Sequence, residues 1–252
     1  MKKTLDRIFS DGLSGMAQGL FATLIIGTII QQIGAMVTGN TGAWIVLIGK
    51  VAAAMTGAGI GVGVARKFEA SQLVVVSAAT AGMVGAFAGK ILSGEILQNG
   101  AIVLAGPGEP LGAFVAAYLA VEVGILIAGK TKLDILITPL ITIGVGSAVG
   151  IFVGPPISKF MAWIGSLINW GTEQQPLIMG IVVSVIMGMV LTLPISSAAL
   201  GIILGLNGVA AGAATVGCCC QMIGFAVTSF KDNGVGGFFA QGIGTSMLQI
   251  PN

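Results

Sequence analysis

The stretch Gly106-Pro107-Gly108-Glu109-Pro110 carries the residue types best suited to binding a polar molecule. Its two prolines and two glycines cannot continue a helix, so backbone groups and the Glu109 carboxylate are left to form hydrogen bonds with a ligand. Such backbone is tolerated at membrane depth only where protein or water surrounds it. Two interpretations stay open. Gly106, Gly108, Glu109 and Pro110 line a binding site inside a helical bundle, or Glu109 is an ordinary acid of a loop in water.

A second carboxylate, Glu122, lies inside an apolar stretch. Acidic groups at such positions are rare, costly and usually turned toward the protein interior, which makes Glu122 a candidate for binding a solute or an ion. Lys50 lies inside another apolar stretch. The favoured interpretation is a structural ion pair between Lys50 and Glu122.

Uncharged polar residues near the C-terminus are further candidates. Ser196 and Ser197 follow Pro194 and resemble a helix N-cap, whose free amides attract anionic or hydroxylic ligands, although capping alone would explain them. Asn207 and Gln221 lie in a long uncharged region. They would line a solute pathway or form interhelical hydrogen bonds.

Several kinds of chemistry are excluded by residue type. The chain has no histidine, which removes histidine metal sites, histidine bases and a phosphohistidine. Cys218, Cys219 and Cys220 are consecutive in an apolar run without a basic neighbour, so we expect packing rather than redox or metal chemistry. We therefore expect no catalytic residue, no metal and no cofactor.

The elements that position these residues must lie in lipid. Of 252 residues, 55% are hydrophobic and 8% are charged, and the mean hydropathy is +1.03. A soluble domain carries about 25% charged residues. The net charge of +2 is too small and too dispersed for nucleic-acid binding. The composition predicts an all-α integral membrane protein, a polytopic helical bundle.

A spanning helix needs about 20 mostly apolar residues. Six stretches meet this requirement: Gly15–Val37, Ala43–Ala65, Ser71–Gly89, Leu111–Ala128, Leu133–Gly154 and Pro176–Leu193. With the broken helix expected around Asn207 and the interrupted tail Val235–Asn252, the count is roughly seven to eight spans, with broken helices and re-entrant loops.

Two details of this arrangement follow from local composition. Pro155-Pro156 is expected to end the fifth span, and Ile157–Trp170, with helical apolar spacing and two tryptophans, is expected to lie at the membrane interface. Small residues recur four positions apart at Gly57-Gly61, Gly59-Gly63 and Ala81-Gly85, a spacing that lets helices approach closely in lipid.

Basic residues indicate the orientation. The N-terminal segment, the turn at Arg66-Lys67 and the turn at Lys130 and Lys132 fall on one side of the predicted topology. The positive-inside rule places that side, and the N-terminus, in the cytoplasm. The loop before Pro110 then begins from the outer side.

At this point the chain resembles a known family, the membrane-embedded IIC components of the bacterial phosphoenolpyruvate-dependent sugar phosphotransferase system. Gly106-Pro107-Gly108-Glu109-Pro110 resembles the G-x-x-E-P signature in which these carriers hold a sugar with the glutamate. The run Leu104 to Phe114 is similar to the IIC-like branch, and the likeness extends over the whole chain, including Thr192 to Ser197 and Gly242 to Asn252. In the glucose-type carriers, however, this motif lies late in the chain.

The resemblance implies a single IIC-like domain over residues 1–252. It also implies further apolar segments beyond the point matching Asn252, so we expect a C-terminally truncated form. It further implies a homodimeric carrier in the bacterial plasma membrane that binds a sugar near the midplane and depends on a IIB phosphocarrier protein. The absence of a phosphoryl-accepting residue of the usual kind agrees with this division of labour.

Two other functions stay open. One is a phosphorelay-independent facilitator or ion-coupled transporter of a small polar metabolite, in which Glu122 carries a proton or cation. The other is a membrane receptor or scaffold that transports nothing. The solute itself is not specified by any residue spacing.

Overall fold

The computed structural model describes residues 7–172, 174–192, 206 and 208–249. The chain forms two compact units, Met1–Ser158 and Lys159–Asn252, which are described separately. Nearly all regular structure in the described residues is helical, which confirms an all-α membrane protein. The predictions at Ser196, Ser197 and Asn207 lie outside the described residues.

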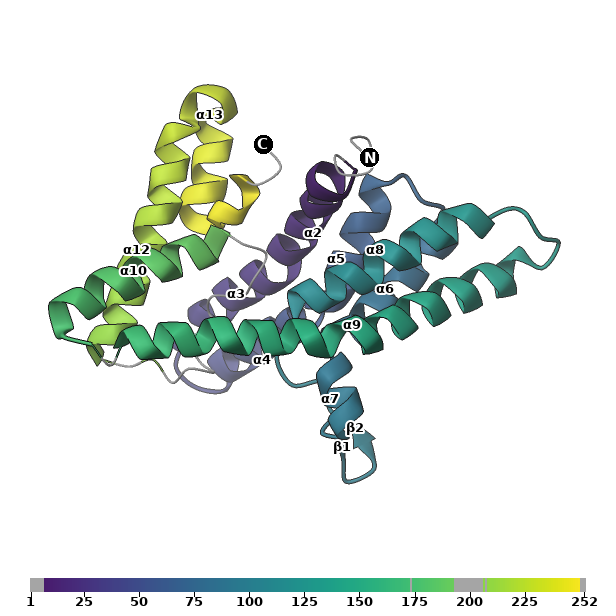
Figure 1. Ribbon diagram of the computed structural model, residues 1–252, viewed down its shortest axis with the longest axis horizontal. Coiled ribbons are helices and arrows are strands. Elements are labelled where there is room, and N and C mark those ends of the chain that lie inside the picture. Colours follow the sequence, from purple (N-terminus) through teal and green to yellow (C-terminus); the bar gives the residue numbers. More distant parts are fainter. Residues whose placement is uncertain (1–6, 173, 193–205, 207, 250–252) are drawn as a thin grey trace. The chain divides into compact units, whose positions relative to one another are not determined.

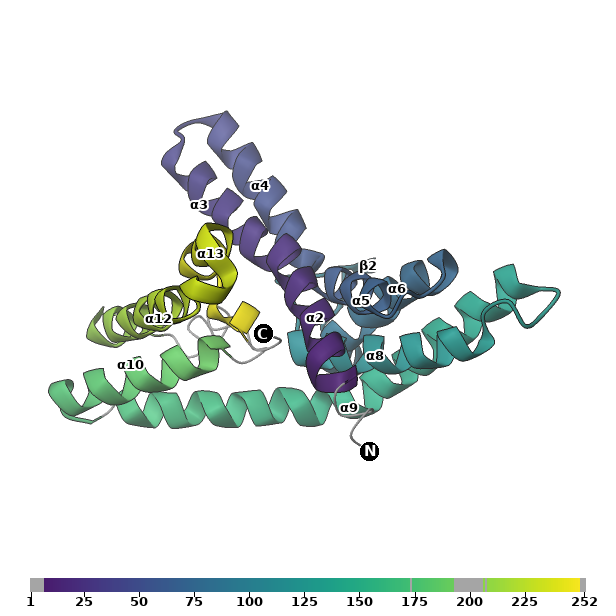
Figure 2. The same cartoon turned by 90° about the horizontal axis from the view of Figure 1, so that it is seen from above.

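The first unit begins with two long antiparallel segments. The first joins η1 (Arg7–Gly12), α2 (Leu13–Leu20), η2 (Phe21–Ile25) and α3 (Ile26–Met36). The second joins α4 (Asn40–Ala54) and α5 (Thr56–Lys67). Figure 2 shows α3 and α4 side by side, pointing away from α5, α6 and α8.

The single span predicted over Ala43–Ala65 is bent by 50° where α4 meets α5. At the bend the hydroxyl of Thr56 donates to the carbonyl oxygen of Ala53 at 2.6 Å. Side-chain hydroxyls that bond to nearby carbonyls compete with the regular helix ladder and bend helices. The apolar composition of this stretch does not reveal the bend, because composition does not show that the Thr56 hydroxyl bonds to a nearby carbonyl.

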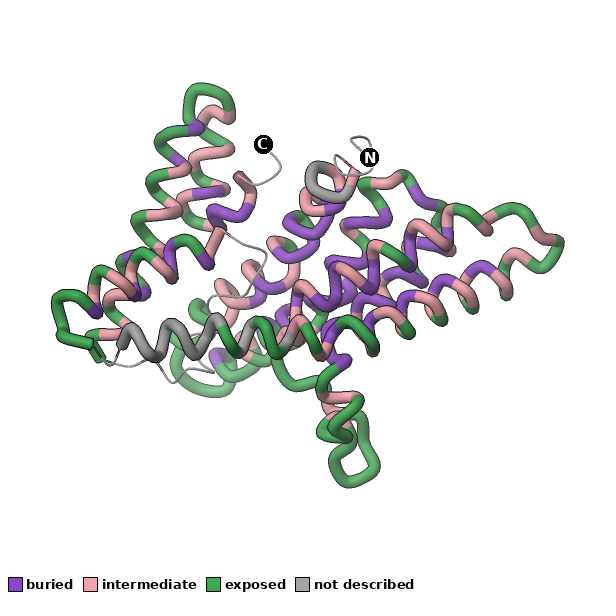
Figure 3. Tube along the Cα trace, in the orientation of Figure 1, coloured by how far each residue is buried: buried purple, intermediate pink, exposed green. Residues whose placement is uncertain are grey.

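Glycines set how closely the helices of this unit pack. On α5, Gly59 and Gly63 face Gly19 and Gly15 of α2 so closely that an added Cβ would collide with backbone carbonyls. The alternate pair, Gly57 and Gly61, faces α6 (Gln72–Ala86) in the same way, against Gly82 and Ala78. Figure 3 shows the buried positions concentrated on α2, α5, α6 and α8. The predicted spacing of small residues is therefore confirmed as helix packing.

Two more helices complete this packing, α8 (Pro110–Ile127) and α9 (Asp134–Thr172). Gly85 of α6 meets Gly112 of α8. On α9, Gly146 meets Ala81 and Ala120, and Gly150 meets Gly85 and Ala116. The prediction that the helix ends at Pro155-Pro156 is wrong, because α9 continues through both prolines. That residues 157–170 lie at the membrane interface stays a prediction. Prolines are tolerated in membrane helices where neighbouring groups satisfy the freed carbonyls.

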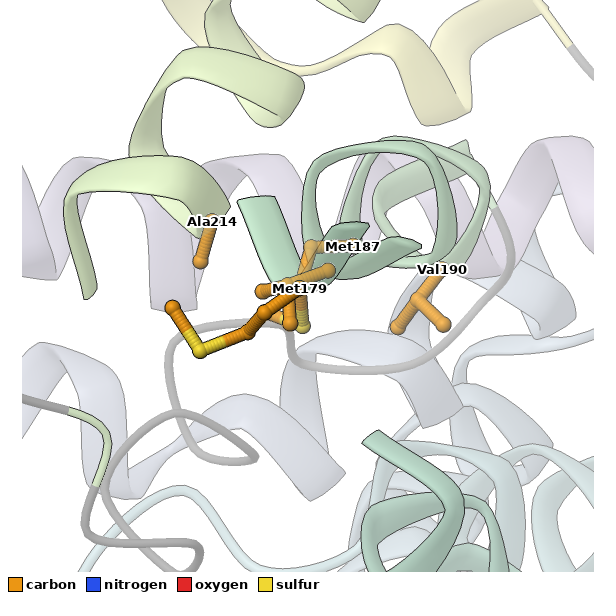
Figure 4. Packing of buried hydrophobic residues seen from close by; sticks show 5 residues of the cluster. Met179, Met187, Val190 and Ala214 are labelled. Carbon is orange, nitrogen blue, oxygen red and sulfur yellow. The ribbon is translucent and has the colours of Figure 1, made fainter. Parts of the chain in front are cut away.

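The second unit is built from α10 and α12 with a short C-terminal segment. Its elements are α10 (Pro176–Thr192), α12 (Gly208–Thr228), α13 (Phe230–Phe239), η3 (Ala240–Gly244) and η4 (Ser246–Gln249). Figure 4 shows the α10 side chains of the buried cluster with Ala214 of α12 beside them. The tail predicted as interrupted therefore holds short helical turns.

The surface agrees with a lipid environment. Large apolar side chains are widely exposed, including Met36 at 83%, Leu177 at 80% and Phe152 at 79%. In water such side chains would favour aggregation, whereas lipid solvates them. In the described residues four helices are long and apolar enough to cross a membrane, or five if the bent pair α4 and α5 is one span. The expected seven to eight spans are not confirmed.

Adding a methyl group at the α5–α6 contact should destabilise the protein. In Gly61→Ala the new Cβ meets the carbonyl group of Ala78, and such overpacking costs about 1–3 kcal/mol. The matched control is Gly144→Ala, since a Cβ there meets no described atom within 4 Å apart from its chain neighbours and the nearby backbone of its own helix. Thermal unfolding in detergent should show a lower midpoint for the first variant only. Equal midpoints would contradict the packing described for α5.

Candidate functional site

The loop predicted as a binding site comes after the end of α6, where the helix is interrupted. α6 ends at Ala86, and α7 (Ala88–Ser93) leads into a small hairpin of β1 (Leu97–Gln98) and β2 (Ala101–Ile102). The residues between the strands, Asn99 and Gly100, both have positive φ, as in a type I′ turn. Figure 1 shows α7 and the hairpin projecting away from α5, α6 and α8. The chain then returns through Gly106 to the start of α8.

Glu109 is fixed by its backbone and caps α8 with its side chain. Its amide donates to the carbonyl oxygen of Ala86 at 2.7 Å, which ties the loop to the end of α6. Its carboxylate accepts from the amide of Leu111 at 3.5 Å, and Pro110 is the first residue of α8. An acidic N-cap followed by proline is a favourable helix start. The conformation of Glu109 is therefore set by the two helices it connects.

The two glycines of the loop differ in their surroundings. Gly108 has φ +71°, and a Cβ there would lie 2.7 Å from the carbonyl oxygen of Ala86. Gly106 has φ +81°, but apart from its two chain neighbours no described atom lies within 4 Å of its Cβ position. Gly108 thus serves close backbone packing, while Gly106 leaves space beside the loop.

Lys90 supports the loop from the preceding helix. Its ammonium group donates to the carbonyl oxygen of Ala105 at 2.8 Å and lies 5.6 Å from the centre of the Phe87 ring. The Phe87 side chain is buried at the break between α6 and α7. Lys90 thereby holds the part of the loop that leads back to α8 close to the break between α6 and α7. The amide of Glu109 bonds to a carbonyl group at the same break.

The environment of Glu109 leaves part of its carboxylate available. The side chain is half-buried, and burial raises the pKa of Glu109 while the hydrogen bond from the Leu111 amide lowers it. In the described part of the chain, Leu111 is the only donor to this carboxylate. A carboxylate has two oxygens with about four acceptor positions, so it can also receive hydrogen bonds from a hydroxylated solute.

Glu122 lies in a different environment on the same helix. Its carboxylate is 2.8 Å from Nε of Arg7, and the Arg7 guanidinium lies 4.6 Å from the centre of the Phe68 ring. The ring of Tyr118 contacts Phe68 edge-on, with centroids 5.7 Å apart. The charge of Glu122 is thus balanced by Arg7. The cluster connects η1 and α8 with Phe68, which follows α5.

The predicted ion pair between Lys50 and Glu122 is wrong. Lys50 is exposed on α4, which packs against α3, whereas α8 packs against α5 and α6. A signal for Arg7 was present in the predicted topology, because Glu122 lies toward the end of its span that is on the same side as the N-terminal segment. Lys50 lies toward the opposite side, near the start of its own apolar stretch.

The structure does not bring the two carboxylates together. Glu122 follows Glu109 by thirteen positions (122 − 109), which corresponds to about 20 Å along a helix. That distance exceeds the length of a single sugar ring. Glu109 lies where α6 ends and α8 begins, and Glu122 lies toward the opposite end of α8, near Arg7.

The fold and the site define a polytopic helical membrane protein in which a half-buried carboxylate is held at a break between helices. A family profile described as Phosphotransferase system, EIIC, matches residues 10–252. The chain therefore belongs to this family and is a membrane sugar-transport component of the phosphotransferase system. The resemblance that began with the Glu109 motif is confirmed. No curated protein and no solved structure matches the chain.

Removing Arg7 should destabilise the protein because it leaves the Glu122 carboxylate without its counter-charge. Both side chains are partly exposed, so we expect Arg7→Met to cost about 1–2 kcal/mol rather than the larger value of a fully buried pair. Lys50→Met is the matched control and should have no comparable effect. The double variant Arg7→Met with Glu122→Gln should recover part of the loss in thermal unfolding. Equal destabilisation by Arg7→Met and Lys50→Met would refute the pairing.

The two loop glycines should respond differently to alanine. Both substitutions strain a positive φ, but only Gly108→Ala also drives a Cβ against the carbonyl oxygen of Ala86. We expect Gly108→Ala to reduce sugar uptake in reconstituted vesicles several-fold more than Gly106→Ala does. Similar uptake by the two variants would show that the contact with Ala86 is not needed.

Proposed function

We propose that Glu109 is the residue with which this carrier holds the hydroxyl groups of its sugar. The observation that carries the proposal is the arrangement of its carboxylate, half-buried at the start of α8 with one hydrogen bond from the Leu111 amide. Its position is set by the bond from its own amide to Ala86, so it does not depend on a solute to be ordered. A preorganised acceptor loses little conformational entropy on binding.

The neighbouring residues support this role through the backbone. Gly106 leaves open space beside the loop, and Gly108 lets the loop approach α6. Pro110 begins α8 without needing an amide partner. On this proposal, Gly106, Gly108 and Pro110 shape the site, and Glu109 provides its charge. Glu122, which is paired with Arg7, serves the structure of α8 instead.

The charges of the chain support the orientation that we propose. Arg7 reaches Glu122 at the end of α8 that is far from Glu109, and Arg66, Lys67, Lys130 and Lys132 flank the helices of that end. The positive-inside rule supports placing this end, with the N-terminus, in the cytoplasm. Glu109 would then be reached from the outer side of the plasma membrane.

Phosphorylation requires a partner on this proposal. The chain contains no histidine, and Cys219 and Cys220 are exposed on α12 inside an apolar run. EIIC components in general work with a IIB protein, and we propose that a IIB phosphocarrier supplies the phosphoryl group at the cytoplasmic end. A homodimer and a single IIC-like domain over residues 1–252 complete the proposal.

Neutralising Glu109 should weaken sugar recognition. Glu109→Gln keeps the size of the side chain but replaces a charged acceptor, and hydrogen bonds to charged groups contribute about 1.5–3 kcal/mol. We expect half-saturation of uptake to rise about 10- to 100-fold in vesicles that contain the cognate phosphorelay proteins. Glu95→Gln, a neutralised acid that is exposed beside the β hairpin, is the matched control. Unchanged uptake by Glu109→Gln would exclude Glu109 as the sugar ligand.

A further inference from the structure

Lys90, on α7 of the first unit, carries a positive charge that no carboxylate balances. Its ammonium group donates to the carbonyl oxygen of Ala105 at 2.8 Å and lies 5.6 Å from the centre of the Phe87 ring. Among the described residues, no carboxylate lies within ion-pair distance of this group. An ammonium group has three N–H donors, and the described chain accepts from one of them. Because the side chain is only half-buried, the other two donors are available to a ligand.

Glu109 is in the complementary situation. Its carboxylate accepts one hydrogen bond, from the amide of Leu111, and in the part of the chain that is described it has no cationic partner. It is also half-buried. Lys90 and Glu109 are therefore a donor and an acceptor of opposite charge that do not pair with each other, and each has unused hydrogen-bonding capacity.

The two groups lie at the two ends of one short loop whose ends are fixed. Lys90 holds the loop at Ala105, and the amide of Glu109 donates to the carbonyl oxygen of Ala86 at 2.7 Å. Glu109 follows Ala105 by four positions, and four positions of chain span at most about 14 Å. With a hydrogen bond of about 3 Å at each end, one hexose is long enough to bridge these two fixed points.

The loop leaves room for a solute between the fixed points. Gly106 is exposed, and apart from its chain neighbours no described atom lies within 4 Å of its Cβ position. Gly108, in contrast, packs against the carbonyl oxygen of Ala86. The open side of the loop is thus next to Ala105, where the ammonium group of Lys90 lies.

Lys90 is also held in place before a solute binds. A lysine side chain loses conformational entropy when a ligand orders it, but the carbonyl oxygen of Ala105 and the buried ring of Phe87 already order this one. A preorganised donor loses less on binding. The same two contacts balance part of the charge of Lys90, so the loop keeps the negative charge of Glu109.

We infer that Lys90 is a second solute-contacting residue of the site at Glu109, and that it donates a hydrogen bond to an oxygen of the solute. The inference rests on the proposed function and assigns the donor side of the same site. Glu109 accepts from one hydroxyl group of the solute, Lys90 donates to a different one, and the solute lies beside Gly106. A lysine that only supported the loop would weaken the contacts of all hydroxyl groups alike.

The experiment removes the hydroxyl groups of the solute one at a time. The probes are glucose, mannose, galactose and the monodeoxy derivatives of each, and their affinities are measured by thermal shift on the purified full chain. In the native protein, loss of one particular hydroxyl group should weaken binding about tenfold or more, as expected for a hydrogen bond to a charged group. In Lys90→Met the parent sugar should bind about tenfold more weakly, and loss of that same hydroxyl group should cost nothing further.

Two matched variants accompany Lys90→Met. Lys90→Arg keeps the charge and the donors and should restore the sensitivity to the critical hydroxyl group. Lys130→Met neutralises an exposed lysine beyond the end of α8 and should behave like the native protein. If Lys90→Met weakens the parent sugar and all deoxy derivatives by the same factor, Lys90 is only a positioning residue and the inference is overturned.

The same probes separate this inference from the proposed function. Glu109→Gln should abolish the sensitivity to a hydroxyl group other than the one that depends on Lys90. If Glu109→Gln does so and Lys90→Met changes no sensitivity, Lys90 is refuted and the role of Glu109 stands. If only Lys90→Met abolishes a sensitivity, the role of Glu109 fails instead. If none of the hexoses binds to the native protein, both fail together.

A measurement on the native protein does not depend on how the variants fold. Each lysine is acetylated with acetic anhydride, and the extent is followed by mass spectrometry with and without the hexose that binds most tightly. The bound hexose should protect Lys90 several-fold and leave Lys130 unchanged. Acetylation of Lys90 at the same rate in the presence of a saturating hexose would overturn the inference.

Discussion

The contact of α5 with α2 and α6 through glycine is the interaction on which the rest of the first unit depends. In lipid, helices gain little by leaving an apolar solvent, so close backbone packing must hold them together. Gly59 and Gly63 serve one neighbour, and Gly57 and Gly61 serve the other. This double contact fixes α6, and the carbonyl group at the end of α6 receives the amide of Glu109. The position of the candidate site thus follows from helix packing.

The carboxylates of Glu109, at the start of α8, and Glu122, within α8, have different surroundings. These surroundings indicate which of the two stabilises the structure and which can bind a solute. Glu122 has a cation at 2.8 Å and an aromatic cluster beside it, so its charge is already compensated. Glu109 has only a weak hydrogen bond from an amide two residues further on. A carboxylate with unused acceptor positions contributes more free energy to binding a hydroxylated solute than a carboxylate that must first break its ion pair with a guanidinium group. This difference favours Glu109 over Glu122 as the solute ligand.

The sequence predicted those features that depend on residue type along the chain. Helical membrane architecture, the glycine spacing of α5 and the interruption at Glu109 all follow from local composition. The partner of Glu122 did not, because the choice between Arg7 and Lys50 depends on which helices are neighbours. The bend beside Thr56 coincides with a single hydrogen bond from its hydroxyl to the carbonyl oxygen of Ala53, which composition does not reveal. Composition also did not predict that α9 continues through Pro155-Pro156. The hydrogen bonds of Gln241 join η3 to Ser229, between α12 and α13, and to Gln249 of η4, and no residue spacing predicts them.

An anionic site for a neutral solute also affects what happens after phosphorylation. On the proposed function, the sugar is uncharged when Glu109 binds it and anionic once a IIB partner has phosphorylated it. Two like charges about 6 Å apart repel by about 3 kcal/mol at an effective dielectric constant near 20. That energy corresponds to roughly a hundredfold loss of affinity when Glu109 is ionised. The same carboxylate that holds the sugar would therefore favour release of the product, without a phosphate-binding group in this chain.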